Sequence, residues 1–143
     1  MKIIAATINH LESVYELLCE LENEILDKIA FTKIYQNNIS NENIHYILAV
    51  YESNIIGFGS LHVQELLHHC AYVGEIQELV VSKEHQGTGV GTMLFNELNK
   101  IALTTSCQQL EVACNFLRKK SHKFYLKQGM KKSHYKFTCP LLT

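Results

Sequence analysis

A chain of 143 residues is long enough for one domain, and folding would bury roughly 70% of the surface that the unfolded chain exposes. Its 13 basic and 14 acidic residues leave a net charge of −1, which provides no general attraction to nucleic acid or to membranes. The N-terminal apolar run 1–7 is too short for a signal peptide, and no apolar stretch is long enough for a membrane span. We therefore expect a single domain over residues 1–143, located in the cytoplasm.

The five cysteines form no pattern typical of a disulfide framework or a structural zinc site. Their number is odd, and no two of them stand in a Cys-x-x-Cys pair. We interpret them as small buried or half-buried residues. Their positions are Cys19, Cys70, Cys107, Cys114 and Cys139.

Hydrophobic periodicity predicts a mixed α/β chain. The expected elements are strand 2–6, helices 10–22 and 24–36, a hairpin of strands 45–52 and 55–65, strand 72–81, helix 89–103, strand 109–115, helix 119–128, and one or two strands in 130–139. One proline and the absence of low-complexity tracts argue against an interdomain linker. Strands that come early and helices that are interleaved later predict a mixed sheet covered by helices on both faces.

Residues 75–91 run from an apolar strand into a glycine-rich turn that begins an amphipathic helix. Gly87, Gly89 and Gly91 let the backbone pass close to an anion and adopt positive φ angles. The free N–H groups of the first helical turn, together with the helix dipole, can then bind a pyrophosphate. The alternative is a glycine-rich turn without any ligand.

The spacing of this turn distinguishes between phosphate ligands. A P-loop requires Lys and then Ser or Thr after the last glycine, whereas Gly91 is followed by Thr92 and Met93. A Rossmann fingerprint requires a third glycine where Thr92 stands. The pattern Gln86-x-x-Gly89-x-Gly91 instead resembles the coenzyme A signature of the GCN5-related N-acetyltransferase (GNAT) family.

Further segments extend this resemblance over nearly the whole chain. Residues 121–130 are similar to the second motif of the family, an A-x-x-F-Y-x-x-x-G-F pattern. Segments 14–21, 61–69, 74–81 and 133–138 resemble the branch of the family that acetylates aminoalkylphosphonates. The main departures are residues 23–43 and 103–110. The resemblance implies that residues 23–43 help to form the wall of the acceptor pocket.

The resemblance implies an α+β fold with a mostly antiparallel sheet, in which strands 72–81 and 109–115 splay apart around the pantetheine arm of acetyl-CoA. The backbone of Leu79, Val80 and Val81 is expected to bind pantetheine and to polarise the thioester. The other expected coenzyme A contacts are Gln86, Gly87, Thr88, Gly89, Val90, Gly91, Thr92 and Asn115. For Asn115, the alternative is a residue that merely ends its strand.

Two acids in the apolar strand 72–81, Glu75 and Glu78, are candidates for the catalytic base. An alkylammonium with a pKa of about 10.4 is neutral in only about one of two thousand molecules at pH 7, so a nearby carboxylate is needed to accept its proton. Odd and even strand positions face opposite sides, but a β-bulge, which the family carries here, would bring both acids to one side. Glu75 lies eleven residues before Gln86, a spacing that resembles that of the general base in histone acetyltransferases, so we rank Glu75 slightly ahead of Glu78. For either acid, the alternative is a solvated strand residue.

The remaining candidates concern the leaving group and the acceptor. Tyr125 matches the family tyrosine that faces the departing sulfur, with a buried packing tyrosine as the alternative. His62, Arg118 and His134 are candidate acceptor-binding residues, although Arg118 equally suits a solvated basic patch. A divalent metal that bridges a phosphonate to scattered histidines is a further alternative, and no metal ligand is assigned.

The expected partners are therefore acetyl-CoA and a small-molecule primary amine, with an aminoalkylphosphonate as the preferred acceptor. A polyamine, an aminoglycoside or a protein amine are alternatives with the same chemistry. A regulatory coenzyme A-binding domain without turnover is an alternative of a different class. Dimers are frequent in the family, so a homodimer is left open.

Overall fold

The computed structural model describes residues 1–142, which fall into two compact units. The first spans Met1–Val112 and the second begins at Ala113. The second contains α4 (Lys119–Lys127) and a segment without helix or strand after it. No helix in the described part of the chain has both the length and the apolar character needed to cross a bilayer.

A five-stranded sheet forms the centre of the first unit. Its strands follow each other in chain order: β1 (Lys2–Ala5), β2 (Ile44–Tyr51), β3 (Asn54–Leu66), β4 (Ala71–Val81) and β5 (Cys107–Val112). The first four strands are antiparallel to their neighbours, and β5 pairs with β4 in parallel. The predicted mixed, mostly antiparallel sheet is confirmed.

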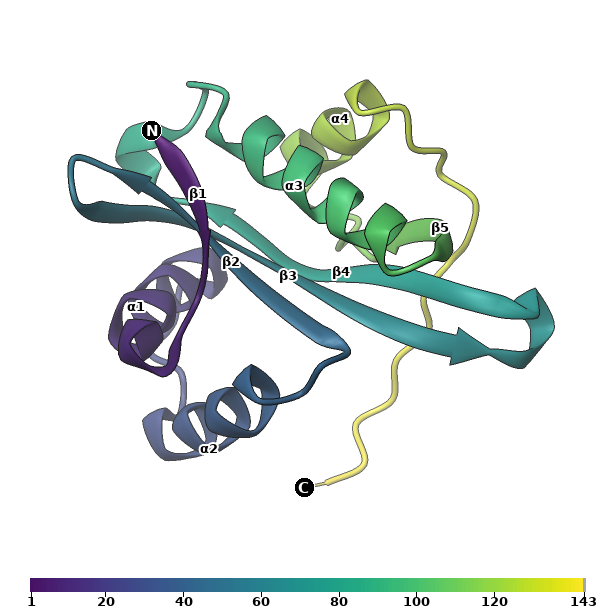
Figure 1. The fold of residues 1–143 in the computed structure, drawn as a ribbon, viewed down its shortest axis with the longest axis horizontal. Coiled ribbons are helices and arrows are strands. Elements are labelled where there is room, and N and C mark those ends of the chain that lie inside the picture. The colour runs from purple at the N-terminus through teal and green to yellow at the C-terminus, as the bar shows by residue number, and fades with distance from the viewer. Residues whose placement is uncertain (143) are drawn as a thin grey trace. The chain divides into compact units, whose positions relative to one another are not determined.

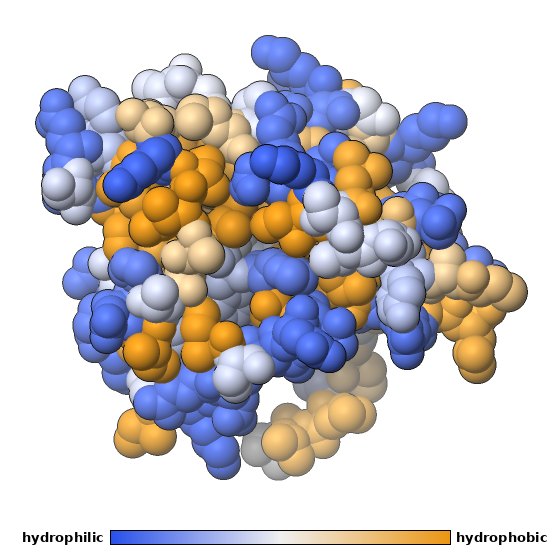
Figure 2. Space-filling view, in the orientation of Figure 1, coloured by the Kyte–Doolittle hydropathy of each residue, from blue (hydrophilic) through white to orange (hydrophobic). Residues whose placement is uncertain are grey.

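Helices cover both faces of this sheet (Figure 1). The helices α1 (Leu11–Glu22) and α2 (Lys28–Ile39) lie on one face, and α3 (Val90–Thr104) lies on the other. The core between the sheet and α1 and α2 consists of Val14, Leu17, Tyr35, Leu48, Phe58 and Val80. Figure 2 shows that hydrophilic side chains interrupt the hydrophobic surface in this view.

The second helix begins later than its hydrophobic pattern indicates, at Lys28 instead of residue 24. Asn23 ends α1 in the left-handed conformation with φ of 54°, and its N–H donates to the Glu20 carbonyl. Asp27 then caps α2, because its carboxylate accepts a hydrogen bond from the Ala30 N–H at 3.1 Å. The two caps leave a short connection where the prediction placed a helical turn.

Two strand predictions require correction. The strand expected at 109–115 is Cys107–Val112, so Asn115 lies in the following loop and does not end the strand. The strand or strands expected in 130–139 are absent, since this segment has no regular structure. Its aromatic residues Tyr135 and Phe137 are 85% and 91% exposed, so the alternating pattern there buries no apolar face that would stabilise a strand.

Close packing of α3 on β3 depends on two glycines. A Cβ atom at Gly57 would lie 2.9 Å from Leu94 Cδ1 and 3.2 Å from the carbonyl oxygen of Val80. A Cβ atom at Gly59 would meet Leu98 Cδ1 at 3.1 Å, and its other neighbours lie at 3.4 Å. Because glycine has no side chain, these two positions allow the helix to approach the sheet this closely.

We predict that Gly57→Ala lowers the free energy of unfolding by about 1–3 kcal/mol, because α3 must move away from the strand. Gly59→Ala should cost less, because its closest contact is longer, at 3.1 Å, and all three of its close neighbours are side-chain atoms, whereas Gly57 also faces a backbone carbonyl. Urea unfolding of both variants measures the difference. Equal stability of Gly57→Ala and the unmodified protein would contradict the proposed tight packing.

Candidate active site

A β-bulge in β4 determines which side chains the sheet directs towards α1 and α2. The ladder pairs Ser60 with Glu78 and Leu61 with Ile76, so Gln77 is an extra residue on β4. An extra residue reverses the alternation of side chains along a strand. The bulge that the family resemblance implied is therefore present.

The bulge places both candidate acids on one face. His62 pairs with Glu75, just as Ser60 pairs with Glu78. Because Ser60 and His62 alternate with Leu61, they point to the same face, and so do their cross-strand partners. Glu75 and Glu78 therefore both lie on the face that α1 and α2 cover.

A cavity of about 430 Å³ lies on this face of the first unit. Its apolar lining comes from α1, α2, the connection between them and β3. These residues are Val14, Leu18, Leu26, Phe31, Ile34 and Phe58. Polar side chains complete the lining, namely Glu22, Asn38, Tyr46, His62, Gln77 and Glu78, and Tyr35 also contributes. Several of these residues fall in 23–43, the segment expected to form the wall of an acceptor pocket.

The two candidate acids differ in their surroundings. Glu78 lines the cavity, whereas Glu75 does not. The Glu75 carboxylate instead accepts a hydrogen bond from Gln77 Nε2 at 2.6 Å. The Glu78 carboxylate accepts a hydrogen bond from the hydroxyl of Ser60, which is fully buried. The geometry therefore favours Glu78 over Glu75 as the acid that meets a molecule in the cavity.

Tyr46 and Asn38 form a hydrogen-bonded pair in the cavity wall. Asn38 Nδ2 donates to the Tyr46 hydroxyl at 2.8 Å. Burial raises the pKa of Tyr46, the Asn38 hydrogen bond opposes this shift, and the negative charge of Glu78 adds to it. The hydroxyl therefore stays protonated at neutral pH and can donate a hydrogen bond.

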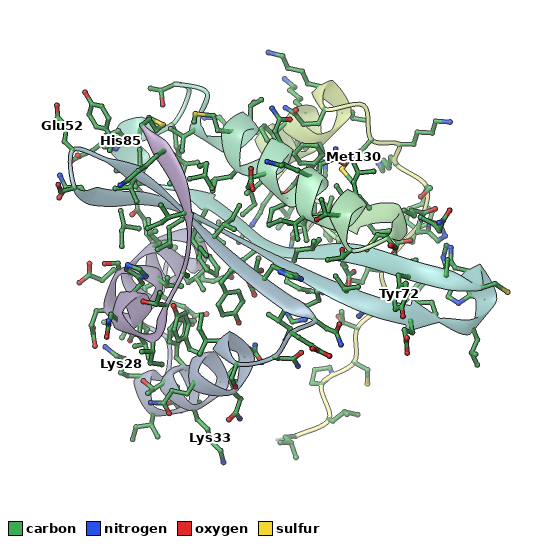
Figure 3. All side chains as sticks on the ribbon, viewed as in Figure 1. Lys28, Lys33, Glu52, Tyr72, His85 and Met130 are labelled. Atoms are coloured by element: carbon green, nitrogen blue, oxygen red, sulfur yellow. The ribbon has the colours of Figure 1, made fainter. Side chains whose placement is uncertain are left out.

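The cavity has an acidic character. Its lining includes two carboxylates, Glu22 and Glu78, and no lysine or arginine. The lysines of α2 are directed elsewhere: Lys28 Nζ contacts Glu12 Oε2 at 2.6 Å, and Lys33 points away from the sheet (Figure 3). Within the first unit, the Glu78 carboxylate therefore gives the cavity a group that can pair with a cation.

One edge of β4 lacks a strand partner near this cavity. The parallel ladder with β5 ends at the pair Ile76 and Val112, whereas β4 continues to Val81. No strand in the described residues pairs with β4 on that side beyond Ile76. Backbone groups at such an edge can bind an extended ligand as if it were a further strand. Leu79, Val80 and Val81, expected to contact pantetheine, lie in this part of β4.

The glycine-rich turn has the open backbone that a phosphate cradle requires. Gly87 and Gly89 adopt φ angles of 76° and 91°, and a Cβ atom at either position would meet no atom within 4 Å. Gly89 is the N-cap of α3, so the free N–H groups of its first turn begin there. The positive φ expected at Gly91 is wrong, because Gly91 lies inside α3. The turn at Gly87 and Gly89 fits a pyrophosphate, and the contacts expected of residues 86–92 stay predictions.

Side chains fix the segment that leads into this turn. Gln86 Nε2 donates to the Val81 carbonyl at 3.1 Å, and the Thr88 hydroxyl donates to the carbonyl of His85. The Lys83 N–H donates to Glu20 Oε1 at 2.9 Å, which connects α1 to the turn. The side chains of Gln86 and Thr88 thus stabilise the loop by hydrogen bonds to its backbone. The resemblance to the coenzyme A signature did not predict this role.

The second unit carries the remaining candidates. Asn115 Oδ1 accepts a hydrogen bond from the Leu117 N–H at 2.8 Å, so its side chain organises its own loop. Arg118 is the N-cap of α4. Burial raises the pKa of Tyr125 to about 12, with a further increase from Cys114 and an opposing effect of Arg118. The roles of these residues stay predictions.

The histidines are not gathered into a metal site. His62 lines the cavity, whereas His68 and His69 lie in the turn between β3 and β4. His134 is exposed and its Nδ1 lies 2.6 Å from the hydroxyl of Ser133. Among residues 1–142, no group of three His, Cys, Asp or Glu side chains is arranged to bind a metal ion.

The sequence analysis did not single out Ser60, Asn38 and Tyr46, nor Glu22 and Gln77 of the cavity lining. Ser60 and Tyr46 occupy opposite positions on β3 and β2, and both side chains point to the face that α1 and α2 cover. For Ser60 and Tyr46, a polar side chain at a core-facing position of an apolar strand could have indicated a functional role. No such sequence signal marked Asn38, because the limits of its helix were predicted wrongly.

The chain is similar to known acetyltransferases in sequence and in fold. Residues 11–130 match the model of the acetyltransferase (GNAT) family. The chain is 39% identical to an aminoalkylphosphonate N-acetyltransferase from Salmonella typhimurium, over 93% of this chain and 86% of the relative. It is 28% identical to a glucosamine 6-phosphate N-acetyltransferase from Candida albicans, over 80% and 76% of the two chains. A crystal structure described as a transcriptional regulator from Bacillus halodurans C-125 superposes with a TM-score of 0.90 at 19% identity, over 98% and 99% of the chains, which shows the shared fold.

The buried Tyr35 in the cavity wall should make the protein sensitive to alkaline pH. Burial raises its pKa to about 12, with a further increase from Tyr46, whereas an unfolded tyrosine ionises near pH 10. The folded state therefore retains a proton that the unfolded state loses, so the free energy of unfolding falls as the pH rises from about 10 to 12. Tyr35→Phe should lose less stability over this range, as measured by urea unfolding at pH 8 and pH 11.

The same variant should be less stable at pH 8 by about 1 kcal/mol, because the Tyr35 hydroxyl donates to the Thr7 carbonyl at 2.7 Å. Tyr51→Phe, which changes an exposed tyrosine, serves as the matched control. An identical alkaline loss in Tyr35→Phe and Tyr51→Phe would refute the assignment to Tyr35.

Proposed function

Since this chain belongs to the acetyltransferase (GNAT) family and is an N-acetyltransferase, we propose that it transfers the acetyl group of acetyl-CoA to the primary amine of an aminoalkylphosphonate. One observation carries the reaction type: Glu78 stands in the wall of a cavity beside the free edge of β4. The similarity to the Salmonella enzyme supports the acceptor class. By their names, both curated relatives act on amines that also bear a phosphorus oxyanion, a phosphonate in one and a phosphate ester in the other.

The first task of the enzyme is to provide a neutral amine. A protonated alkylamine must lose its proton before it attacks, and the deficit at pH 7 is roughly 4–5 kcal/mol without a base. Glu78 accepts this proton in the proposed mechanism, directly or through a water molecule. The apolar walls of the cavity exclude water from the carbon skeleton of the acceptor, and the carboxylate orients its amine end.

The second task is to hold the acetyl donor, which supplies an activated acyl group and a thiolate leaving group. The free edge of β4 at Leu79, Val80 and Val81 offers backbone groups to an extended pantetheine chain. The turn at Gly87 and Gly89, with the start of α3, offers N–H groups to the pyrophosphate. These backbone donors are fixed by the fold before the donor binds, so little reorganisation is required.

The third task is to stabilise the departing thiolate. We assign this role to the hydroxyl of Tyr125. Its pKa of about 12 keeps it protonated at neutral pH. Because a thiol ionises near pH 8.5, the tyrosine is the weaker acid and acts as a hydrogen-bond donor to the sulfur, without full proton transfer. Asn115, Arg118 and His134 remain candidates for contacts to the donor and to the acceptor anion.

A second acceptor class has an observation of its own. The cavity lining includes Glu22 and Glu78 without a lysine or arginine, which suits an acceptor with a second cationic group. A diamine or polyamine meets this description. The reaction with such an acceptor would use the same base and the same donor.

Release of coenzyme A with a panel of amines tests the acceptor class. The panel contains aminomethylphosphonate, 2-aminoethylphosphonate, glucosamine 6-phosphate, putrescine, spermidine, an aminoglycoside and a lysine peptide, each with and without a divalent cation. We expect the two phosphonates to give the highest kcat/KM. A preference for putrescine and spermidine would favour the second class. Acetyl-CoA binding without any turnover would favour a regulatory coenzyme A-binding domain.

We predict that Glu78→Gln lowers kcat by about 10²–10⁴, the range typical of a general base, with little change in acetyl-CoA affinity. Glu75→Gln is the matched control, since it makes the same change three residues away outside the cavity. Its effect should be at least tenfold smaller. A large loss in Glu75→Gln alone would transfer the base to Glu75, and full activity of both variants would remove the base from β4.

The cradle at the glycine-rich turn gives a separate prediction. Gly89→Ala should weaken acetyl-CoA binding by roughly tenfold or more, because a Cβ atom would strain the backbone and occupy the space of the pyrophosphate. Gly129→Ala is the control, because Gly129 has a similar φ of 93° and equally open space. Isothermal titration measures both affinities. Equal affinities of the two variants would contradict the cradle.

A further inference from the structure

We propose that Ser60 is a positioning residue that fixes the carboxylate of Glu78 for deprotonation of the acceptor amine. This inference rests on the proposed function, in which Glu78 is the base. Ser60 itself touches neither the donor nor the acceptor in this scheme. It acts only through the two hydrogen bonds that it shares with Glu78.

The location of Ser60 is unusual for a polar side chain. Among the described residues it is the only polar one that is fully buried, and it lies on the central strand β3 among apolar residues. A buried hydroxyl destabilises the fold unless it is hydrogen-bonded. A small apolar residue would meet the packing requirement at this position without that cost. The hydroxyl therefore points to a role beyond packing.

Both hydrogen-bonding capacities of the hydroxyl are used by one residue. The Glu78 N–H donates to Ser60 Oγ at 2.9 Å, and Ser60 Oγ donates to Glu78 Oε1. Since the oxygen accepts from the backbone, its single proton is directed to the carboxylate. Backbone and side chain of Glu78 are thus attached to the same atom.

This double attachment limits the motion of a long side chain. A glutamate has three side-chain torsions and would otherwise sample many rotamers in a cavity of this size. With Oε1 bound to Ser60, Oε2 is the carboxylate oxygen that has no protein donor among residues 1–142, so it is available to accept the amine proton. Misplacement of a reacting group by about 1 Å can cost a hundredfold in rate.

The bulge explains why Ser60 reaches Glu78. Without an extra residue in β4, the register of Leu61 with Ile76 would place Ser60 opposite Gln77, whereas Glu75 pairs with His62. Glu75 bonds to Gln77 at the surface, whereas Glu78 bonds to Ser60 inside the sheet. Glu78 thus has a buried hydrogen-bond partner, Ser60, whereas the partner of Glu75, Gln77, is exposed.

A double-mutant cycle with kcat as the readout tests this inference. The variants are Ser60→Ala, Glu78→Gln and the combination of both. Ser60→Cys serves as a second variant, because it keeps the shape of the side chain at a slightly larger volume and replaces the hydroxyl by a weak donor. Leu61→Val is the packing control: Leu61 is equally buried next to Ser60 but faces α3. Circular dichroism and acetyl-CoA titration verify that each variant is folded.

We expect Ser60→Ala and Ser60→Cys to lower kcat by on the order of tenfold to a hundredfold, with the KM for acetyl-CoA unchanged. In the Glu78→Gln background, neither change should lower kcat further, because the carboxylate that Ser60 positions is gone. Any effect of Leu61→Val should instead be the same in both backgrounds.

The outcomes separate this inference from the proposed function. If Ser60→Ala lowers kcat by the same factor in both backgrounds, or leaves kcat unchanged in the original one, Ser60 does not position Glu78, although Glu78 remains the base. If Glu78→Gln alone retains full activity, the assignment of the base fails first, and the inference about Ser60 fails with it.

Discussion

One extra residue in β4 determines how the chemistry is distributed over the sheet. Without the bulge at Gln77, Glu75 and Glu78 would face opposite sides, and one of them would point into the core beneath α3. Burial of an unpaired carboxylate there would be strongly unfavourable. The bulge therefore keeps the core on the α3 side apolar and also delivers a carboxylate to the cavity on the other side.

The two faces of the sheet serve different purposes as a result. On the α3 face, Gly57 and Gly59 permit close packing, and this holds the start of α3 and its glycine-rich turn in a fixed place. On the other face, the helices α1 and α2 stand over a cavity that remains open. The hydrogen bond from Lys83 to Glu20 connects α1 to the segment before the turn. This hydrogen bond links the helix that forms part of the cavity wall to the segment before the expected phosphate cradle.

The sequence predicted those features that depend on local chemistry. The glycine-rich turn and the two acids follow from residue types at fixed spacing, and the mostly antiparallel sheet and the free part of β4 followed from the resemblance to a known fold. The partnership of Ser60 with Glu78 depends on strand register, which a bulge of unknown position leaves undetermined. The start of α2 was missed because Asn23 and Asp27 act as caps only when the chain turns between them. The tail after α4 was predicted as strand from its alternation, although alternation stabilises a strand only where one face is buried.

The charge of the cavity bears on the acceptor more than on the reaction. In the proposed mechanism every acceptor brings its amine to Glu78, so the carboxylate selects that end of the molecule. In this proposal the other end faces Glu22, Tyr46 and His62, and the lining residues include no lysine or arginine. A phosphorus oxyanion at that end needs compensating charge from outside this lining, whereas a second ammonium group does not. In this proposal Glu78 and the donor site fix the chemistry, and the groups that meet the far end of the acceptor determine which amine is used.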